Sequence, residues 1–238
     1  MSASIRAEDV GVRFLLDRHR RLVTPMLASL RRRGTEVWGL RHLDLRIEAG
    51  EGVALLGPSG AGKTTLLRTV ARVLDADEGR LLTRGRVGSL LSVDAGLVPV
   101  LTGRENSTLL AALIGLPQPD SSALLDELKA QSGLGEAFER PVASFSQGMH
   151  ARLGFAVIER SRPDILLLDE VHEALDHEFR DVVAAFARRL LRVGGIVLAT
   201  GHDHALLERL CDRAVLLEHG SIRADGPFDQ VQPVVVEA

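Results

Sequence analysis

Short apolar runs alternate with amphipathic stretches along most of the chain. Apolar or alternating runs bounded by turn residues predict strands over residues 5–14, 43–47, 52–56, 87–91, 165–169, 196–199, 214–218 and 221–224. Apolar positions at helical spacing predict helices over residues 66–74, 101–116, 121–131 and 176–193. Strands that alternate with helices indicate an α/β fold. The mainly helical stretch 95–160 is expected to be a subdomain inserted into that α/β core.

Residues 15–33 also carry apolar side chains at helical spacing, with arginines on the other side. We expect a helix there, kinked or split by Pro25 and ended by Gly34. Two interpretations remain open. The segment is either a surface helix with a solvated basic face, or a helix placed near anionic groups such as lipid headgroups or an anionic transported molecule.

Composition limits the classes of protein that the chain can represent. Its 238 residues, 45% of them hydrophobic, fit one large domain with or without an inserted subdomain. The net charge of −3 gives no case for a nucleic-acid partner. A single cysteine, Cys211, excludes an intrachain disulfide and indicates a reducing compartment. No secretory signal and no apolar run of 18 or more residues are found, so we expect a soluble or peripheral protein.

The clearest chemical motif is a glycine-rich loop between a predicted strand and a predicted helix. It fits G-x-x-x-x-G-K-[ST] at every fixed position, and its residues are Gly57, Pro58, Ser59, Gly60, Ala61, Gly62, Lys63, Thr64 and Thr65. The glycines let backbone N–H groups approach a polyphosphate closely, and the helix N-terminus faces the anion. Lys63 is expected to contact the β- and γ-phosphates, and the Thr64 hydroxyl to ligate Mg²⁺. We therefore predict a polyphosphate and Mg²⁺ site.

Two later strands end in polar residues that complete such a site. Residues 165–168 run directly into Asp169 and Glu170. We expect Asp169 to hold Mg²⁺, through a water, and Glu170 to orient or deprotonate the attacking water. His202 follows the strand 196–199 at its carboxyl end, where ligands collect in open α/β sheets, so a contact with the γ-phosphate is predicted.

A further motif indicates a family. The stretch Ser144-Phe145-Ser146-Gln147-Gly148-Met149 precedes a helix and resembles the signature of ATP-binding subunits of ABC transporters, usually L-S-G-G-Q. Ser146 and Gly148 agree with it, whereas Gln147 and Met149 depart. Residues 174–176 resemble the family's D-loop, and His202 its switch histidine. The resemblance covers about residues 5–228.

The resemblance implies an ABC ATPase fold: a P-loop NTPase (RecA-like) core with an antiparallel β subdomain and an inserted helical subdomain, in a single domain over residues 1–238. It also implies a homodimer that binds two ATP molecules between head-to-tail protomers, with Ser146, Gln147 and Gly148 contacting the ATP of the partner. Glu170 and His202 would then be the catalytic residues.

A narrower resemblance is to ATPases that export polysaccharides and teichoic acids. It is carried by residues 145–157, by residues 96–106 (GLVPVLTGREN) and by residues 210–214. The basic helical insert expected over residues 15–37 is also similar to an extra N-terminal helix of that group. The resemblance implies a separate polytopic permease as partner and a position on the cytoplasmic, inner face of the cell membrane.

Some alternatives stay open from the sequence. Either Phe14 or Trp38 could stack on adenine, and the strand context favours Phe14. The position that usually holds the Q-loop glutamine falls near Ser92 or Val93. The alternative functions are a non-transport soluble ABC ATPase and a nucleotide-gated regulatory module without useful turnover.

Overall fold

The computed structural model describes residues 2–16, 35–92, 96–170 and 175–236. Its centre is a six-stranded sheet in the order β5-β6-β7-β3-β8-β9. The strands are β3 (Gly52–Leu56), β5 (Val87–Leu90), β6 (Ile165–Asp169), β7 (Ile196–Thr200), β8 (Arg213–Glu218) and β9 (Ser221–Pro227). The pairs from β5 to β8 are parallel, and β9 closes the sheet antiparallel to β8.

The central strands are apolar throughout because both faces of the sheet are covered. In β3, Val53 and Leu55 lie in one hydrophobic core, while Ala54 and Leu56 lie in the core on the opposite face. All four side chains are buried. The continuous apolar run that predicted this strand therefore reflects burial on two sides, with the faces alternating residue by residue.

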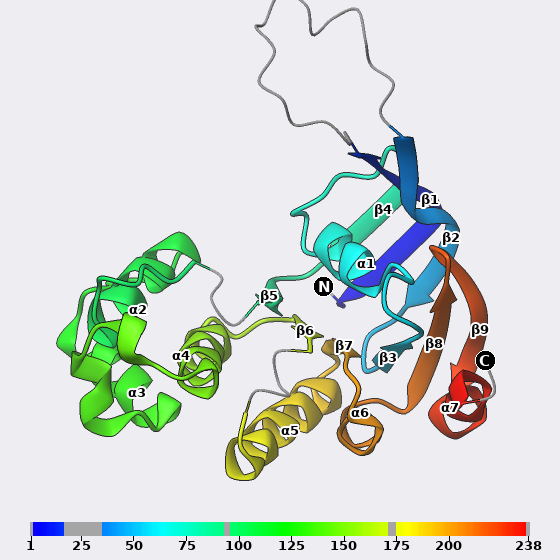
Figure 1. The fold of residues 1–238 in the computed structure, drawn as a ribbon. Coiled ribbons are helices and arrows are strands. Elements are labelled where there is room, and N and C mark those ends of the chain that lie inside the picture. Colours follow the sequence, from blue (N-terminus) through cyan, green and yellow to red (C-terminus); the bar gives the residue numbers. More distant parts are fainter. Residues whose placement is uncertain (1, 17–34, 93–95, 171–174, 237–238) are drawn as a thin grey trace, which may run out of the picture.

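A second, smaller sheet covers one face, as the predicted fold class requires. It is antiparallel in the order β2-β1-β4 and consists of β1 (Ser4–Leu16), β2 (Thr35–Ile47) and β4 (Glu78–Arg84). Helix α1 (Lys63–Val70) packs between the two sheets (Figure 1). Its buried Leu66, Leu67 and Val70 join both sheets into one core.

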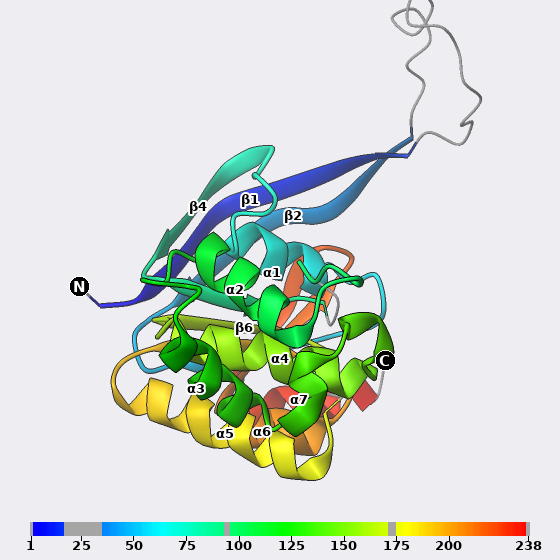
Figure 2. The same ribbon diagram turned by 90° about the vertical axis from the view of Figure 1, so that its left-hand side faces the viewer.

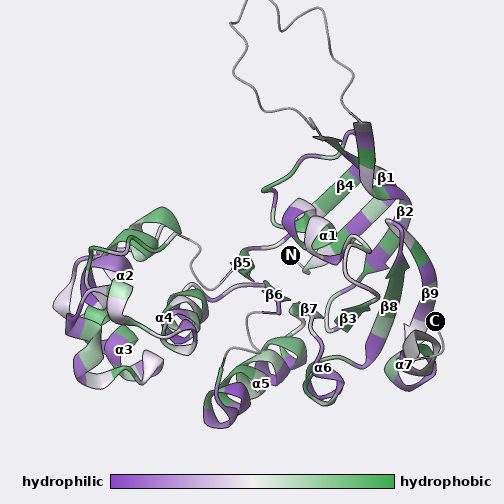
Figure 3. Ribbon diagram, in the orientation of Figure 1, coloured by the Kyte–Doolittle hydropathy of each residue, from purple (hydrophilic) through white to green (hydrophobic). Residues whose placement is uncertain are grey.

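Three helices cover the other face of the large sheet (Figure 1). They are α5 (His177–Arg192), α6 (His204–Leu210) and α7 (Phe228–Val236). Hydrophobic and hydrophilic residues alternate around α5 (Figure 3), and its buried residues Phe179, Val183, Ala187 and Leu190 form the inner stripe. Asp176 caps the helix by accepting a hydrogen bond from the Phe179 N–H, at 3.0 Å.

The helical subdomain lies to one side of the sheets (Figures 1 and 2). Its elements are α2 (Gly103–Leu113), α3 (Ser122–Ser132), the short 3₁₀ turns η1 (Gly135–Glu139) and η2 (Val142–Ser144), and α4 (Gln147–Arg160). It has a hydrophobic core of its own around the fully buried Leu128, Phe138 and Leu153. All of these elements fall within the predicted stretch 95–160. Helix α4 also contacts the core of the large sheet, through Ala151 and Phe155.

The helix predicted over residues 15–33 is wrong at residues 15 and 16, and the helical insert over 15–37 is also wrong at residues 35–37, because strands occupy both stretches. Strand β1 continues through Leu16 and β2 begins at Thr35, so that Leu16 pairs with Thr35 and Leu15 with Glu36. Pairing with a neighbouring strand overrides the local helical spacing of these leucines. The rest of that prediction, residues 17–34 with Pro25 and Gly34, lies outside the described residues. No helix in the described ranges is long and apolar enough to cross a bilayer.

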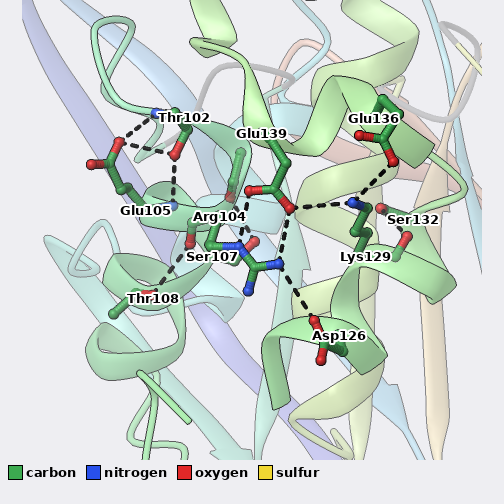
Figure 4. A network of polar contacts seen from close by, with 11 residues as sticks. Thr102, Arg104, Glu105, Ser107, Thr108, Asp126, Lys129, Ser132, Glu136 and Glu139 are labelled. Atoms are coloured by element: carbon green, nitrogen blue, oxygen red, sulfur yellow. Dashed lines mark hydrogen bonds and ion pairs between the residues drawn. The ribbon is translucent and has the colours of Figure 1, made fainter. Parts of the chain in front are cut away.

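A network of ion pairs fixes α2, α3 and η1 of the subdomain to one another (Figure 4). The Arg104 guanidinium on α2 donates to both carboxylate oxygens of Glu139, each at 2.9 Å, and reaches Asp126 on α3 at 3.4 Å. The Lys129 ammonium lies 3.3 Å from Glu139 and 3.5 Å from Glu136. The hydrogen bonds from Arg104, followed by those from Lys129, lower the pKa of Glu139 to about 2.

We predict that Glu139→Gln lowers the midpoint of thermal unfolding at pH 7 by about 2 °C, because it removes the charge that Arg104 and Lys129 share. The folded-state pKa of Glu139 is depressed, from 4.5 to about 2. Its stabilising effect is therefore complete above pH 4.5 and is lost as the pH falls toward 2. Urea unfolding followed by circular dichroism at pH 7 and pH 3 should show the difference from wild type shrinking.

The matched control is Glu136→Gln, since Glu136 reaches Lys129 from an almost fully exposed position. It should change the unfolding midpoint less than Glu139→Gln does at pH 7. Equal shifts for the two variants, or a Glu139→Gln effect that does not depend on pH, would contradict the assigned role of the network.

Candidate functional site

Three strands end side by side at the carboxyl edge of the large sheet. They are β6, β7 and β3, which are direct neighbours in the sheet. The register pairs Asp169 with Thr200, and Thr200 with Leu55, two residues before Gly57. Parallel strands deliver their carboxyl ends to one edge, so the phosphate loop, the two carboxylates and the His202 loop are brought together. This juxtaposition was predicted from the sequence.

The phosphate loop takes a conformation that only glycine fills at two positions. Gly57 and Gly62 have φ of +133° and +107°. A Cβ atom would lie 2.2 Å from the Leu217 carbonyl oxygen at Gly57, and 2.4 Å from the Gly39 carbonyl oxygen at Gly62. The loop therefore lies tightly against β8 and β2, whereas Gly60 at its tip has open space around it.

The remaining loop residues divide into exposed and buried groups. Pro58 and Ser59 are exposed at the tip, and Ala61 is buried beneath it. The Lys63 ammonium is buried and donates to the carbonyl oxygens of Gly57 and Pro58, at 2.7 and 3.1 Å. Both acceptors are neutral, and the cation lies folded over the loop. An anion with several oxygens is the group that this cation and the loop N–H donors fit.

A carboxylate and a hydroxyl form a second part of the site. The Thr64 hydroxyl lies 3.2 Å from Asp169 Oδ1, and the Thr200 hydroxyl 3.4 Å from the same atom. Burial raises the pKa of the Asp169 carboxyl above its ordinary value, and the charge of Glu170 adds to the rise, while the two hydroxyl contacts oppose it. A buried carboxylate next to a hydroxyl is a donor set that fits Mg²⁺, so Thr64 and Asp169 would hold the ion.

Glu170 and His202 face each other in front of this buried pair. Glu170 Oε1 lies 3.5 Å from His202 Nε2, and both side chains are about half exposed or more. Glu170 adopts a left-handed backbone conformation, with φ of +54°, that is uncommon for a non-glycine residue. Its N–H donates to the Thr200 carbonyl oxygen at 3.0 Å, which holds this turn of the chain in place. The pair is accessible to water and to a substrate.

Thr200 is a member of the site that the sequence did not predict. The apolar run of its strand was taken to end at residue 199, so the hydroxyl was assigned to the following loop. Thr200 is fully buried and closes the strand beside Asp169. A polar residue at the last position of a buried strand, beside a carboxylate at the end of its neighbour, was the available signal.

The two candidates for an adenine platform point to opposite faces of the small sheet. Phe14 is 39% exposed, and its ring packs over Gly39, whose other neighbour is Thr65 of the phosphate loop. A Cβ atom at Gly39 would lie 2.6 Å from the Phe14 ring and 3.1 Å from the Thr65 side chain. Gly39 thus lies between the Phe14 ring and Thr65 at this point.

Trp38 has a different environment. Its ring contacts Gly11, and the guanidinium groups of Arg13 and Arg41 lie 5.3 and 5.8 Å from the ring centroid. Arg13 is directly opposite Trp38 across the two strands, so both side chains share the face that Phe14 does not occupy. The geometry favours Phe14 over Trp38 as the platform.

The residues that resemble the ABC signature lie on the helical subdomain. Ser146 caps α4, its hydroxyl accepting a hydrogen bond from the Met149 N–H at 3.2 Å. Ser146, Gln147 and Gly148 line a cavity of about 710 Å³ together with Arg152 and Asp176. The described residues that line this cavity include none from the phosphate loop. The phosphate loop and the N-terminus of α4 are therefore separate surfaces of one chain.

Comparison with known proteins gives the family. The model of the family described as ABC transporter matches residues 40–173, more than half of the chain. The O-antigen export system ATP-binding protein RfbB of Klebsiella pneumoniae is 36% identical over 199 residues, which is 84% of this chain and 81% of that protein. The teichoic acids export ATP-binding protein TagH of Lactococcus lactis is 31% identical over 208 residues, 87% of this chain and 44% of that protein.

A solved structure supports the same fold. The dimeric post-hydrolysis state of the ATP-binding cassette MJ0796 with ADP and Pi matches with a TM-score of 0.75 and 20% identity, over 94% of this chain and 98% of that one. The chain belongs to the ABC transporter family. The predicted ABC ATPase fold class and the assignment as an ATPase are confirmed.

We predict that Phe14→Ala raises the KM for ATP about tenfold and leaves kcat nearly unchanged, because loss of a base-stacking ring costs ~1–3 kcal/mol. Steady-state phosphate release at varied Mg-ATP measures both constants. Trp38→Ala is the matched control, since it removes an aromatic ring from the opposite face of the same sheet. A tenfold rise in KM for Trp38→Ala with none for Phe14→Ala would reverse the assignment.

Proposed function

We propose that the protein is the ATP-hydrolysing subunit of an exporter of polysaccharide or lipid-linked glycan, of the O-antigen, capsule or teichoic acid type. It works as a homodimer on the inner, cytoplasmic face of the cell membrane and drives a separate polytopic permease. The observation that carries the proposal is the match, over 84% and 87% of this chain, to proteins named for O-antigen and teichoic acid export. These relatives favour export over a non-transport ATPase.

Within one protomer, the residues at the sheet edge take distinct roles on ATP. Lys63 exchanges the carbonyl oxygens of Gly57 and Pro58 for oxygens of the β- and γ-phosphates, and the loop N–H groups bind the same anion. Thr64 and Asp169 hold Mg²⁺, which neutralises charge on the phosphates when bound. Phe14 receives the adenine ring.

Glu170 and His202 act at the γ-phosphate end. The Glu170 carboxylate accepts a hydrogen bond from the attacking water and orients it, or removes its proton. His202, 3.5 Å away, donates to the γ-phosphate and keeps the carboxylate in position. Catalysis of this kind consists mostly of positioning and charge stabilisation. The left-handed turn at Glu170 fixes the carboxylate relative to Thr200.

A second protomer completes the site. Ser146, Gln147 and Gly148 at the start of α4 offer a hydroxyl and a helix N-terminus to the γ-phosphate bound by the partner. The support is that these residues and the phosphate loop form separate surfaces in one chain, and that a cassette of the same fold is described as a dimer with ADP and Pi. ATP binding closes the dimer, and hydrolysis reopens it.

Deletion and complementation in the native host tests the proposal. We expect deletion of the gene to remove glycan from the cell surface, wild type to restore it, and Glu170→Gln to fail, because the variant binds ATP without turnover. Surface glycan is measured with a lectin or antibody on intact cells. A tagged copy of the wild-type chain should also bring down one polytopic membrane protein from detergent-solubilised membranes.

The control for expression is the amount of each variant that sediments with membranes, which should equal wild type for Glu170→Gln. Unchanged surface glycan in the deletion strain, together with capture of ribosomal or DNA-associated proteins in place of a membrane protein, would reject export and leave a non-transport ATPase.

A further inference from the structure

One arginine of α5 links two loops that the proposed catalytic cycle uses. Arg180 Nε donates to the Leu175 carbonyl oxygen at 2.9 Å, and Arg180 Nη1 donates to Asp203 Oδ2 at 3.0 Å. Leu175 lies in the D-loop segment, and Asp203 directly follows His202. The Arg180 side chain is only 27% exposed, so both contacts are partly shielded from water.

The contact with Asp203 bears on the position of His202. The other oxygen of the Asp203 carboxylate, Oδ1, accepts the Leu206 N–H at 3.1 Å and caps α6. The carboxylate is therefore held from both sides, by Arg180 of α5 and by the first turn of α6. Because His202 is its immediate neighbour in the chain, fixing Asp203 fixes the backbone that carries the imidazole toward Glu170.

The contact with Leu175 leads in the other direction, toward the signature helix. Leu175 is buried, and the next residue, Asp176, caps α5 and forms an ion pair with Arg152 of α4. The Arg152 guanidinium also lies 4.8 Å from the centre of the Phe179 ring. Arg152 lines the same cavity as Ser146 and Gly148. A continuous set of polar contacts thus runs from the signature helix through the first turn of α5 to the His202 loop.

We propose that Arg180 is a positioning residue for ATP hydrolysis: it couples the D-loop and signature helix of a protomer to the His202 loop of the same protomer. The inference rests on the proposed function, in which the signature of a protomer contacts the partner's ATP while its His202 contacts its own. Arg180 then lets closure on one ATP set the position of His202 at the other.

The chemistry of arginine suits this role. Its planar guanidinium donates to a carbonyl oxygen and to a carboxylate at the same time, in fixed relative directions. A lysine has one nitrogen and can keep the ion pair with Asp203 while losing the fixed geometry at Leu175. Glutamine removes the charge and the fork together. The contacts of residue 180 with Leu175 and Asp203 should therefore weaken in the order arginine, lysine, glutamine.

The test is steady-state ATP turnover by the purified full-length chain at varied Mg-ATP, for wild type, Arg180→Gln, Arg180→Lys and a matched control. The control is Arg189→Gln, which removes an arginine of the same helix that pairs with Glu159 of α4 at 2.9 Å, away from both loops. We expect Arg180→Gln to lower kcat about tenfold with KM within about twofold of wild type. Its Hill coefficient for ATP should fall toward one.

Arg180→Lys should lie between wild type and Arg180→Gln, and Arg189→Gln should match wild type. A merely structural role would lower the melting temperature of the two glutamine variants alike and would leave the Hill coefficient unchanged. If Arg180→Gln does not fold, the inference is tested by Arg180→Lys. We expect this variant to lower kcat about threefold at unchanged KM.

An Arg180→Gln variant with wild-type kcat, or with raised KM at unchanged kcat, overturns the inference while wild-type turnover stands. Absence of turnover by wild type overturns the proposed function itself. The identity of the glycan and the membrane partner do not enter this measurement, so the two failures are distinguishable.

Discussion

The site depends on the register of three parallel strands. Asp169 at the end of β6 is opposite Thr200 at the end of β7, and Thr200 is opposite Leu55 of β3, just before the phosphate loop. A slip of one residue in either pairing would turn a buried apolar face toward the wrong core and carry Asp169 away from Thr64. Burial of these strands on both faces, between α1 on one side and α5 and α6 on the other, is what fixes that register.

This arrangement combines stability with a strained polar edge. The strands themselves contribute fully buried apolar side chains, whereas their carboxyl ends hold a desolvated carboxylate, a left-handed glutamate and a lysine folded over its own loop. Each of these features costs free energy in the isolated chain. In the proposed function, a polyphosphate with a divalent cation would relieve two of them, because the anion would engage Lys63 and the cation would engage Asp169.

The parts of the structure that the sequence predicted are those specified by motifs or periodic patterns of neighbouring residues. The phosphate loop, the strand that ends in Asp169 and Glu170, and the helices of residues 95–160 are each encoded by neighbouring residues. Strand β4 was missed because it is mostly exposed and lacks a clear apolar alternation, and α6 because seven residues give too little periodicity. The helix expected over residues 15–33 was wrong at residues 15 and 16, because β1 pairs with β2 there.

The sequence did not predict which residues surround a given side chain in the folded protein. The strand context favoured Phe14 over Trp38, but their surroundings depend on the pleat of β1 and β2, which turns Phe14 toward Thr65 and Trp38 toward Arg13. The link through Arg180 joins residues 23 positions apart and has no periodic signal. Val93, one of the two positions near the expected Q-loop glutamine, and Ala174 of the D-loop lie outside the described residues.

The central claim is that a catalytic site is shared between two copies of the chain, the phosphate loop of one facing the signature of the other. Disulfide trapping between Ser59→Cys and Gln147→Cys, in chains that also carry Glu170→Gln, tests it most directly. Both positions are exposed, and the sole native thiol, Cys211, is buried. We expect a disulfide-linked dimer on a non-reducing gel only with Mg-ATP, and none for either single-cysteine variant. A cross-link within one chain, or one between chains that forms equally well without ATP, would contradict the account.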